Sequence, residues 1–126
     1  MTNAAFHRQI PVLPVADLKA TIKYYKSKLG FSDEWFWEDT DAGCGRNELF
    51  MLFNLNPELL QAIQSAAAPF EIIWIVEQVD VIYNEYAQKE LAIISEPENK
   101  PWGMREFTIK DINGYTIRIA EPIENE

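Results

Sequence analysis

Three tryptophans are the residues of this sequence best suited to hold a flat ligand. Trp35 and Trp37 lie two residues apart in a segment with strand character, so both side chains should lie on one face of that strand. Trp102 precedes a further predicted strand, next to the flexible Gly103. Indole rings stack on planar heteroaromatic groups, and nearby carboxylates attract a cationic group. Acidic residues accompany the first two tryptophans: Glu34, Glu38 and Asp39. Core packing is the alternative role for Trp35 and Trp37.

Arg118 is a charged residue at the centre of the last predicted strand. The segment 115–120 alternates, with Tyr115, Ile117 and Ile119 on one face and Thr116, Arg118 and Ala120 on the other. Before it, Asn113-Gly114 predicts a hairpin turn. Glu106, in the predicted strand 104–110, shares the parity of Met104 and Thr108. We expect Glu106 to line a cleft, and a salt bridge that fixes strand order is the alternative.

The residues needed for common catalytic arrangements are sparse. Cys44 is the one cysteine and His7 the one histidine, so the pattern favours a small structural role for Cys44 and excludes an intrachain disulfide. The sequence has no G-x-S-x-G motif and no glycine loop that would cradle a phosphate. No catalytic residue is therefore predicted.

The composition narrows the class of partner. The net charge of -9, from 11 Lys+Arg against 20 Asp+Glu, disfavours nucleic acid as a partner. There is neither an apolar run of membrane-spanning length nor a signal-peptide pattern, which predicts a cytoplasmic protein without a membrane partner. The length of 126 residues fits one domain.

The first half of the chain reads as a strand, a helix and three strands. Segment 10–15 predicts an edge strand because of its two prolines, and Asp17 predicts the cap of a helix that ends at Gly30. Strands are expected at 31–38, 42–46 and 48–54. Phe50, Leu52 and Phe53 of the last strand would supply an apolar floor. A short helix, 58–67, follows Pro57 as part of a linker.

The second half repeats the same pattern. A strand at 70–77 and a helix at 79–90 precede three further strands, and a shift of 61 residues superimposes Leu18 on Val79 and Tyr25 on Tyr86. We therefore predict an α+β fold of two tandem β-α-β-β-β modules with a cleft. Module one covers about 8–54, the linker helix about 55–69 and module two about 70–121, within a single domain, 1–126.

These features resemble the vicinal oxygen chelate superfamily. The opening I-P-V-L-P-V-A-D-L-K-A-T-I-K-Y-Y-K-S-K-L-G-F, the repeat and the closing P-W-G-M-R-E-F-T-I-K-D-I-N-G-Y carry the resemblance, which covers nearly the whole chain. The superfamily includes glyoxalase I, extradiol dioxygenases, and fosfomycin and bleomycin resistance proteins, and the closing motif is most similar to the bleomycin resistance proteins. The resemblance identifies the fold, whereas one scaffold hosts many chemistries.

The metal ligands of that superfamily can be compared position by position with this chain. The matching residues are Ile10, Leu52, Glu71 and Arg118, of which Glu71 is the one plausible ligand. Arg118 stands where metalloenzymes carry Glu, and a guanidinium has no lone pair to donate and repels a divalent ion. The resemblance thus implies no metal and no other cofactor. It also implies an ion pair between Glu71 and Arg118, which either holds a polar ligand group or replaces the metal as a structural contact.

The sequence as a whole favours a binding protein. The expected function is the metal-independent binding and sequestration of a planar, cationic small molecule, as in the bleomycin resistance proteins, whose ligand is a cationic glycopeptide with a flat bithiazole. The expected assembly is a homodimer with two clefts. The expected ligand-binding residues are Trp35, Trp37, Leu52, Glu71, Trp102, Glu106 and Arg118. The alternatives are a glyoxalase-type lyase or isomerase or a dioxygenase with an atypical metal site, and a dimeric module without a small-molecule ligand.

Overall fold

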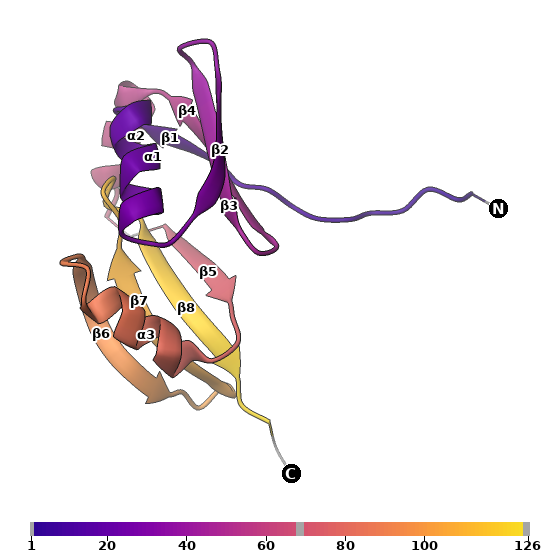
Figure 1. Ribbon diagram of the computed structural model, residues 1–126, viewed down its shortest axis with the longest axis vertical. Helices are drawn as coiled ribbons and strands as arrows, with labels where there is room; N and C mark the ends of the chain where they lie inside the picture. Colours follow the sequence, from indigo (N-terminus) through magenta and orange to yellow (C-terminus); the bar gives the residue numbers. More distant parts are fainter. Residues whose placement is uncertain (1, 68–69, 125–126) are drawn as a thin grey trace.

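The computed structural model describes residues 2–67 and 70–124 and contains two modules of one strand, one helix and three strands (Figure 1). The first module comprises β1 (Val12–Val15), α1 (Leu18–Ser27), β2 (Ser32–Trp37), β3 (Asp41–Arg46) and β4 (Leu49–Leu55). Helix α2 (Pro57–Gln64) connects it to the second module, which comprises β5 (Glu71–Ile75), α3 (Val79–Ala87), β6 (Ala92–Asn99), β7 (Met104–Lys110) and β8 (Thr116–Pro122). The predicted α+β repeat is confirmed.

Each module forms a four-stranded sheet of the same topology. The N-terminal sheet has the order β1-β4-β3-β2 and the C-terminal sheet the order β5-β8-β7-β6. The first strand of each module pairs in parallel with the last, and the remaining neighbours are antiparallel. β1 is an edge strand, as Pro11 and Pro14 predict, because a proline, which has no N–H, can lie in an edge strand without breaking a ladder of hydrogen bonds.

The helices of the two modules start in different ways. The Asp17 side chain accepts a hydrogen bond from the Ala20 N–H at 2.9 Å and begins α1. α3 has no such cap of its own. Instead the Glu121 carboxylate at the end of β8 accepts the N–H groups of Gln78 (2.9 Å) and Val79 (3.1 Å). The last strand of module two therefore fixes the start of that module's helix.

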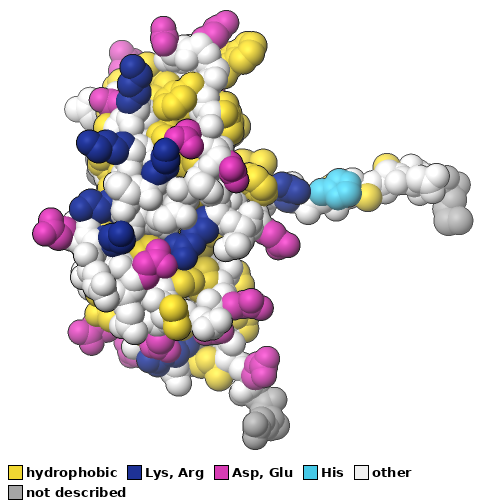
Figure 2. Space-filling view, in the orientation of Figure 1, with side chains coloured by type: hydrophobic (Ala, Val, Ile, Leu, Met, Phe, Trp, Pro, Cys, Tyr) yellow, Lys and Arg dark blue, Asp and Glu magenta, His cyan; other side chains and the backbone are white. Residues whose placement is uncertain are grey.

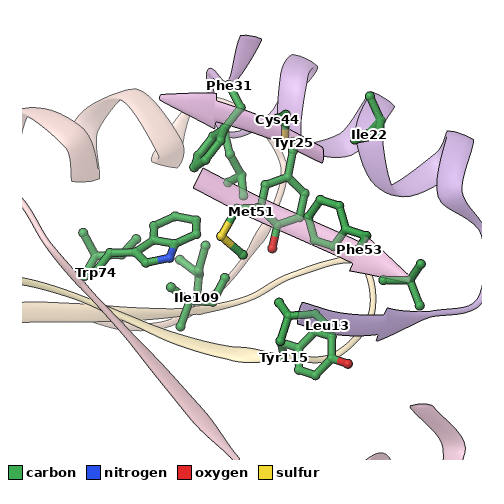
Figure 3. Packing of buried hydrophobic residues seen from close by; sticks show 14 of the residues in the cluster. Leu13, Ile22, Tyr25, Phe31, Cys44, Met51, Phe53, Trp74, Ile109 and Tyr115 are labelled. Carbon is green, nitrogen blue, oxygen red and sulfur yellow. The ribbon is translucent and has the colours of Figure 1, made fainter. Parts of the chain in front are cut away.

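One apolar core runs through both modules between the helices and the sheets (Figure 3). Trp74 of β5 enters it close to module one, with its ring 5.3 Å from that of Phe31 and 6.4 Å from that of Tyr25. At the other end, Leu13 of β1 is buried in the same core, and Tyr115 of module two donates its hydroxyl to the carbonyl of the next residue, Pro14, at 2.5 Å. Each module thus lends an apolar side chain of its first strand to the common core.

Two tyrosines at equivalent helix positions bind across the module boundary. Tyr25 of α1 donates its hydroxyl to the Asp111 carboxylate at 2.7 Å, in the turn between β7 and β8. Tyr86 of α3 donates to the carbonyl of Leu29 in module one at 2.8 Å. Next to it, the Arg46 guanidinium makes two hydrogen bonds with the Glu85 carboxylate, at 2.8 and 2.9 Å. The modules are held by reciprocal polar contacts as well as by the core.

Several predicted boundaries differ from those found. β1 starts at Val12 and not at residue 10, α1 ends at Ser27 before Gly30, and α2 ends at Gln64. α3 ends at Ala87, three residues before the predicted end. The predicted linker region includes residues 68–69, which lie outside the described residues.

The turn between β7 and β8 is wider than the predicted two-residue hairpin. Only Gly114 of this turn has a left-handed backbone, with φ +85°. The Asp111 carboxylate accepts hydrogen bonds from the N–H groups of both Asn113 and Tyr115 at 2.9 Å, and these bonds shape a turn over residues 111–115.

In the described part of the chain, no helix combines the length and the apolar character that a bilayer span requires.

Candidate functional site

The face of the N-terminal sheet that points away from α1 is open and rich in apolar side chains. A cross-strand row of Val12, Leu52, Gly43 and Trp35 runs over it, because these residues are register partners on neighbouring strands. Trp35 is 43% exposed, Trp37 63% and Phe50 40%. We call this surface, made of Val12, Trp35, Trp37, Phe50 and Leu52, the N-terminal open face.

Trp35 lies flat against the backbone of its neighbouring strand. A Cβ added to Gly43 would lie 2.5 Å from the Trp35 ring, so the ring occupies the space that a side chain at position 43 would need. The exposure of Trp35 and Trp37 rules out core packing as their role. One face of the Trp35 indole ring thus packs on the backbone at Gly43, and the opposite face is exposed to solvent.

The predicted apolar floor divides between the two faces of β4. Phe50 and Leu52 belong to the open face, whereas Phe53 is fully buried on the helix side. Glu34 also lies away from the tryptophans, because its carboxylate binds Lys26 of α1. That hydrogen bond lowers the pKa of the Glu34 carboxyl below its usual value.

The C-terminal sheet carries a polar cluster on the equivalent face. The Glu106 carboxylate is buried and binds two donors, since one oxygen accepts from Arg118 Nε at 2.9 Å and the other from Trp102 Nε1 at 3.2 Å. The Arg118 guanidinium also lies 5.6 Å from the centre of the Trp102 ring, within cation–π distance. Glu106 therefore fixes the positions of both neighbours. We call Glu71, Trp102, Glu106 and Arg118 the polar cluster.

The predicted ion pair between Glu71 and Arg118 is present but is the weaker of two. Arg118 Nη1 lies 3.9 Å from Glu71 Oε1, whereas Arg118 Nη2 lies 2.9 Å from Glu106 Oε1. The side chain of Glu71 is 46% exposed and that of Glu106 only 4%. Glu106 therefore takes the partner role expected of Glu71, and the Glu71 carboxylate keeps most of its capacity to bind a cation.

A hollow of about 500 Å³ lies beside Glu71, between the two modules. Ile73 and Trp74 of β5, Phe50 of β4 and residues 8–11 line it. The guanidinium of Arg8 stands 4.7 Å from the centre of the Phe50 ring. The chain that precedes this lining segment extends away from the modules (Figure 1). The hollow has the volume of a site for a small organic molecule.

The seven predicted site residues form two groups. The structure brings Glu71, Trp102, Glu106 and Arg118 together on the C-terminal sheet and leaves Trp35, Trp37 and Leu52 on the N-terminal sheet. The sequence did not predict a place in the site for Gly43, for Ile73, or for Arg8, which lies against Phe50. Of these, Gly43 had a signal, because a glycine inside a strand indicates close approach of another group.

The residues at the metal-ligand positions do not fit a divalent ion. Ile10 and Leu52 have no donor atom, and the guanidinium of Arg118 occupies the space between the Glu71 and Glu106 carboxylates. Among residues 2–67 and 70–124, no group of three or more His, Cys, Asp or Glu side chains is placed to hold a metal. A fixed cation in that position would repel the ion.

Cys44 and the buried tyrosines lie outside this surface. Cys44 is buried in the core, and burial raises the pKa of its thiol to about 12. The fraction of reactive thiolate at neutral pH is then very small. Burial likewise raises the pKa of Tyr86 to about 12. These groups contribute to structure, as predicted for Cys44.

A sequence profile of the Glyoxalase/Bleomycin resistance protein/Dioxygenase superfamily matches residues 8–119. The chain belongs to this superfamily. No curated protein matches the sequence at a significant level. The superfamily joins two classes of enzyme with resistance proteins, so membership alone leaves the activity open.

Solved structures with the same fold include three with informative descriptions. A bleomycin resistance determinant encoded on the transposon Tn5 has 21% sequence identity and a TM-score of 0.76, with 93% of this chain and 98% of that chain covered. TioX from Micromonospora sp. ML1 has 16% identity and a TM-score of 0.75, with coverages of 94% and 100%. The bleomycin-binding protein of Streptomyces verticillus, complexed with copper(II)-bleomycin, has 19% identity and a TM-score of 0.72, with coverages of 97% and 99%.

Proposed function

We propose that this superfamily member binds and sequesters a planar, cationic small molecule without a metal ion. The observation that carries the proposal is the combination of an exposed tryptophan surface with a polar cluster whose outer carboxylate, Glu71, is only loosely paired. Stacking on indole rings gives affinity for a flat group, and a half-exposed carboxylate at the edge of an apolar face gives preference for a cation. The net charge of -9 steers cations toward the protein.

The proposed assembly is a homodimer. Each chain exposes an apolar face on both sheets, with Trp35 and Trp37 on one and Ile73 and Ile75 on the other. In an antiparallel pair of chains, the C-terminal sheet of each copy would cover the N-terminal open face of the other, so the same contact would form two times. Each of the two clefts would then combine tryptophans from one copy with the polar cluster from its partner.

The members of the polar cluster take different roles in this proposal. Both oxygens of the Glu106 carboxylate already accept hydrogen bonds, one from Trp102 and one from Arg118. Glu106 therefore positions these two side chains and does not contact the cationic group of the ligand. Trp102, a residue that is 59% exposed, is the stacking residue of the cluster. Glu71 binds the positive group of the ligand. Leu52 and Phe50 supply apolar contacts opposite.

Support also comes from the proteins that share the fold. Two of them are described as bleomycin-binding or bleomycin resistance proteins, and a bleomycin-type ligand combines a flat ring system with a positive charge. The further proposal is that sequestration of such a compound in the cytoplasm protects the cell, as an antibiotic resistance function. A glyoxalase-type lyase or a dioxygenase is not favoured, because the Arg118 guanidinium stands between the carboxylates where a metal ion would bind.

The test is a titration of tryptophan fluorescence with metal-free bleomycin A2, followed by the same titration of three variants. Saturable quenching is expected. Glu71→Gln should weaken binding by roughly tenfold, since a charge-assisted contact is lost. Trp102→Ala should weaken it by a similar factor. Glu124→Gln, an exposed acid outside the cluster, removes the same charge and should leave binding unchanged.

Two results would overturn the proposal. Stoichiometric zinc, nickel, manganese or iron in the purified protein would show that the polar cluster is a metal site after all. Absence of quenching by bleomycin and by simpler flat cations such as ethidium would leave a module without a ligand of this class. Sedimentation equilibrium tests the dimer separately, and a monomer at all concentrations would contradict the composite clefts.

A further inference from the structure

A second hollow lies on the opposite side of the N-terminal sheet, between α1 and β2. Its volume is about 530 Å³. Ile22 and Phe36 form its floor, and α1 supplies a row of lysines along its rim: Lys19, Lys23 and Lys26. In Figure 2 the dark blue side chains of Lys and Arg gather over the part of the surface where α1 lies in Figure 1. We call this hollow the lysine groove.

The groove exists because α1 leaves the outermost strand uncovered. The buried side of α1 packs on the sheet interior, where Ala42 and Phe53 are fully buried. β2 is the edge strand, and Phe36, which faces the helix side opposite Ala42, is still 48% exposed. An exposed aromatic ring beside a row of ammonium groups is a surface that a molecule with an apolar body and a negative charge would complement.

The charges in the groove oppose those of the whole protein. α1 contributes Lys19, Lys23 and Lys26 to the groove, in a chain with only 11 Lys+Arg against 20 Asp+Glu. Lys26 is neutralised by Glu34. Among the described residues, the ion pairs do not include Lys19 or Lys23, which are therefore the charges available to a ligand.

The second module is an internal comparison for the lysine row. A shift of 61 residues, which superimposes the buried Tyr25 on the buried Tyr86, places Asp80, Asn84 and Ala87 at the positions of the three lysines. Asp80 binds Arg105 of its own sheet. The equivalent helix thus packs on its sheet without any lysine in these positions. The row in α1 is a property of this module and not a requirement of the fold.

The shape of β2 favours a small molecule over a peptide strand. The pairing of β2 with β3 shifts register between Ser32 and Trp35, and Asp33 has a left-handed backbone with φ +54°. Such an irregularity bends an edge strand and prevents regular addition of a further strand. The groove is a shallow depression that is wide open to solvent, so its occupant is a small flat molecule that lies against the surface.

We propose that the lysine groove binds a small organic anion with a flat apolar body, such as an aryl carboxylate or aryl phosphate. The apolar body packs on Phe36 and Ile22, and the anionic group is bound by the ammonium groups of Lys19 and Lys23. This site lies on the other face of the sheet from the N-terminal open face, so it is independent of the proposed cation site. The protein then carries two sites of opposite charge preference.

The test uses sodium 2-naphthoate as the probe and the ¹⁵N-labelled full chain. Amide signals of residues 19–27 and 34–36 should shift on titration, and raising the ionic strength should weaken the binding. The double variant Lys19→Gln/Lys23→Gln should weaken binding by roughly tenfold. The matched control Lys89→Gln/Lys110→Gln has the same net charge and should retain the affinity. The neutral isostere 2-naphthamide should bind markedly more weakly.

Distinct outcomes would overturn this inference. Shifts confined to the sheet faces around Trp35 or Trp102, or equal affinity for naphthoate and naphthamide, would show that the lysines do not select an anion. A short acidic peptide that binds the groove more tightly than naphthoate would replace the small molecule as occupant. Glu71→Gln should leave naphthoate binding intact, so failure of the cation site and failure of the lysine groove are separable.

Discussion

Replacement of Arg118 by methionine tests the central feature of the polar cluster, which is a buried carboxylate held by a single cation. Glu106 is 4% exposed, and its two oxygens are bound by Arg118 and by Trp102 Nε1. Arg118→Met keeps an apolar side chain of similar length and removes the charge. The carboxylate is then buried without a counter-charge, which is strongly unfavourable.

The magnitude follows from the burial of the two partners. Loss of one member of a buried ion pair costs about 3–5 kcal/mol, and the lower end applies here because the Arg118 side chain is 23% exposed. With a urea dependence of about 2 kcal/mol per M, a loss of about 3 kcal/mol moves the unfolding midpoint down by about 1.5 M. Equilibrium urea unfolding, followed by far-UV circular dichroism at neutral pH, measures this shift.

The companion variants identify the cause. Glu106→Gln/Arg118→Met replaces both charges, so it should recover a large part of the stability lost in Arg118→Met alone. Arg105→Met breaks the exposed pair with Asp80 and should scarcely move the midpoint. A midpoint for Arg118→Met within about 0.3 M of the wild type, or a double variant that shows the sum of the two single losses, would refute a buried, singly compensated carboxylate.

Three further predictions concern the module boundary and the tryptophan surface. Tyr25→Phe leaves one Asp111 oxygen without its hydroxyl donor, so it should lower the free energy of unfolding, measured by urea titration, by about 1–3 kcal/mol. Tyr83→Phe is the control, because the Tyr83 hydroxyl makes no hydrogen bond among the described residues, and it should change the free energy of unfolding little. Burial raises the pKa of Asp111 despite the hydrogen bonds that it accepts, so the folded state favours its protonated form. The stability of the wild type relative to Asp111→Asn should therefore fall as the pH rises above about 4, the ordinary pKa of an aspartate, and a rise would contradict the assignment. Gly43→Ala should displace the Trp35 ring, seen as a changed emission spectrum and weaker bleomycin quenching, and an unchanged spectrum would show that the ring does not lie on that glycine.

The repeat and the strand periodicities were sufficient to predict the fold. Helix spacing in both halves and the shift of 61 residues depend on local patterns, which survive in α1 and α3 with their buried Tyr25 and Tyr86. Boundaries were predicted less well. The turn after β7 illustrates the reason, because the Asp111 side chain, and not the Asn-Gly pair, determines its width.

The partner of Arg118 depended on a register that no local pattern contains. Thr108 is the direct cross-strand partner of Arg118, and Glu106 comes two residues before Thr108 in β7. A guanidinium on a long side chain reaches this diagonal neighbour. Glu71, on the other neighbouring strand, is also displaced by two residues from the direct partner Ile73. The sequence alone could not show which of these two diagonal carboxylates is the main partner of Arg118. In the structure it is the buried Glu106.

Period-two alternation predicted the shared face of Trp35 and Trp37 but not the partners of the acids near them. Glu34 is adjacent in sequence to Trp35 and binds Lys26, which comes from α1 on the other side of the sheet. Proximity along a strand does not place two side chains on the same face. The same rule separates Phe53 from Leu52.

The reciprocal tyrosine contacts have a consequence for how the molecule comes apart. Opening of module two would leave the Tyr25 hydroxyl and the Pro14 carbonyl without their partners, and opening of module one would do the same to the Tyr86 hydroxyl and the Trp74 ring. We therefore expect neither half to persist as a partly unfolded intermediate. Although the chain is a tandem repeat, its halves should melt in one transition, and separately expressed halves should fold only when mixed.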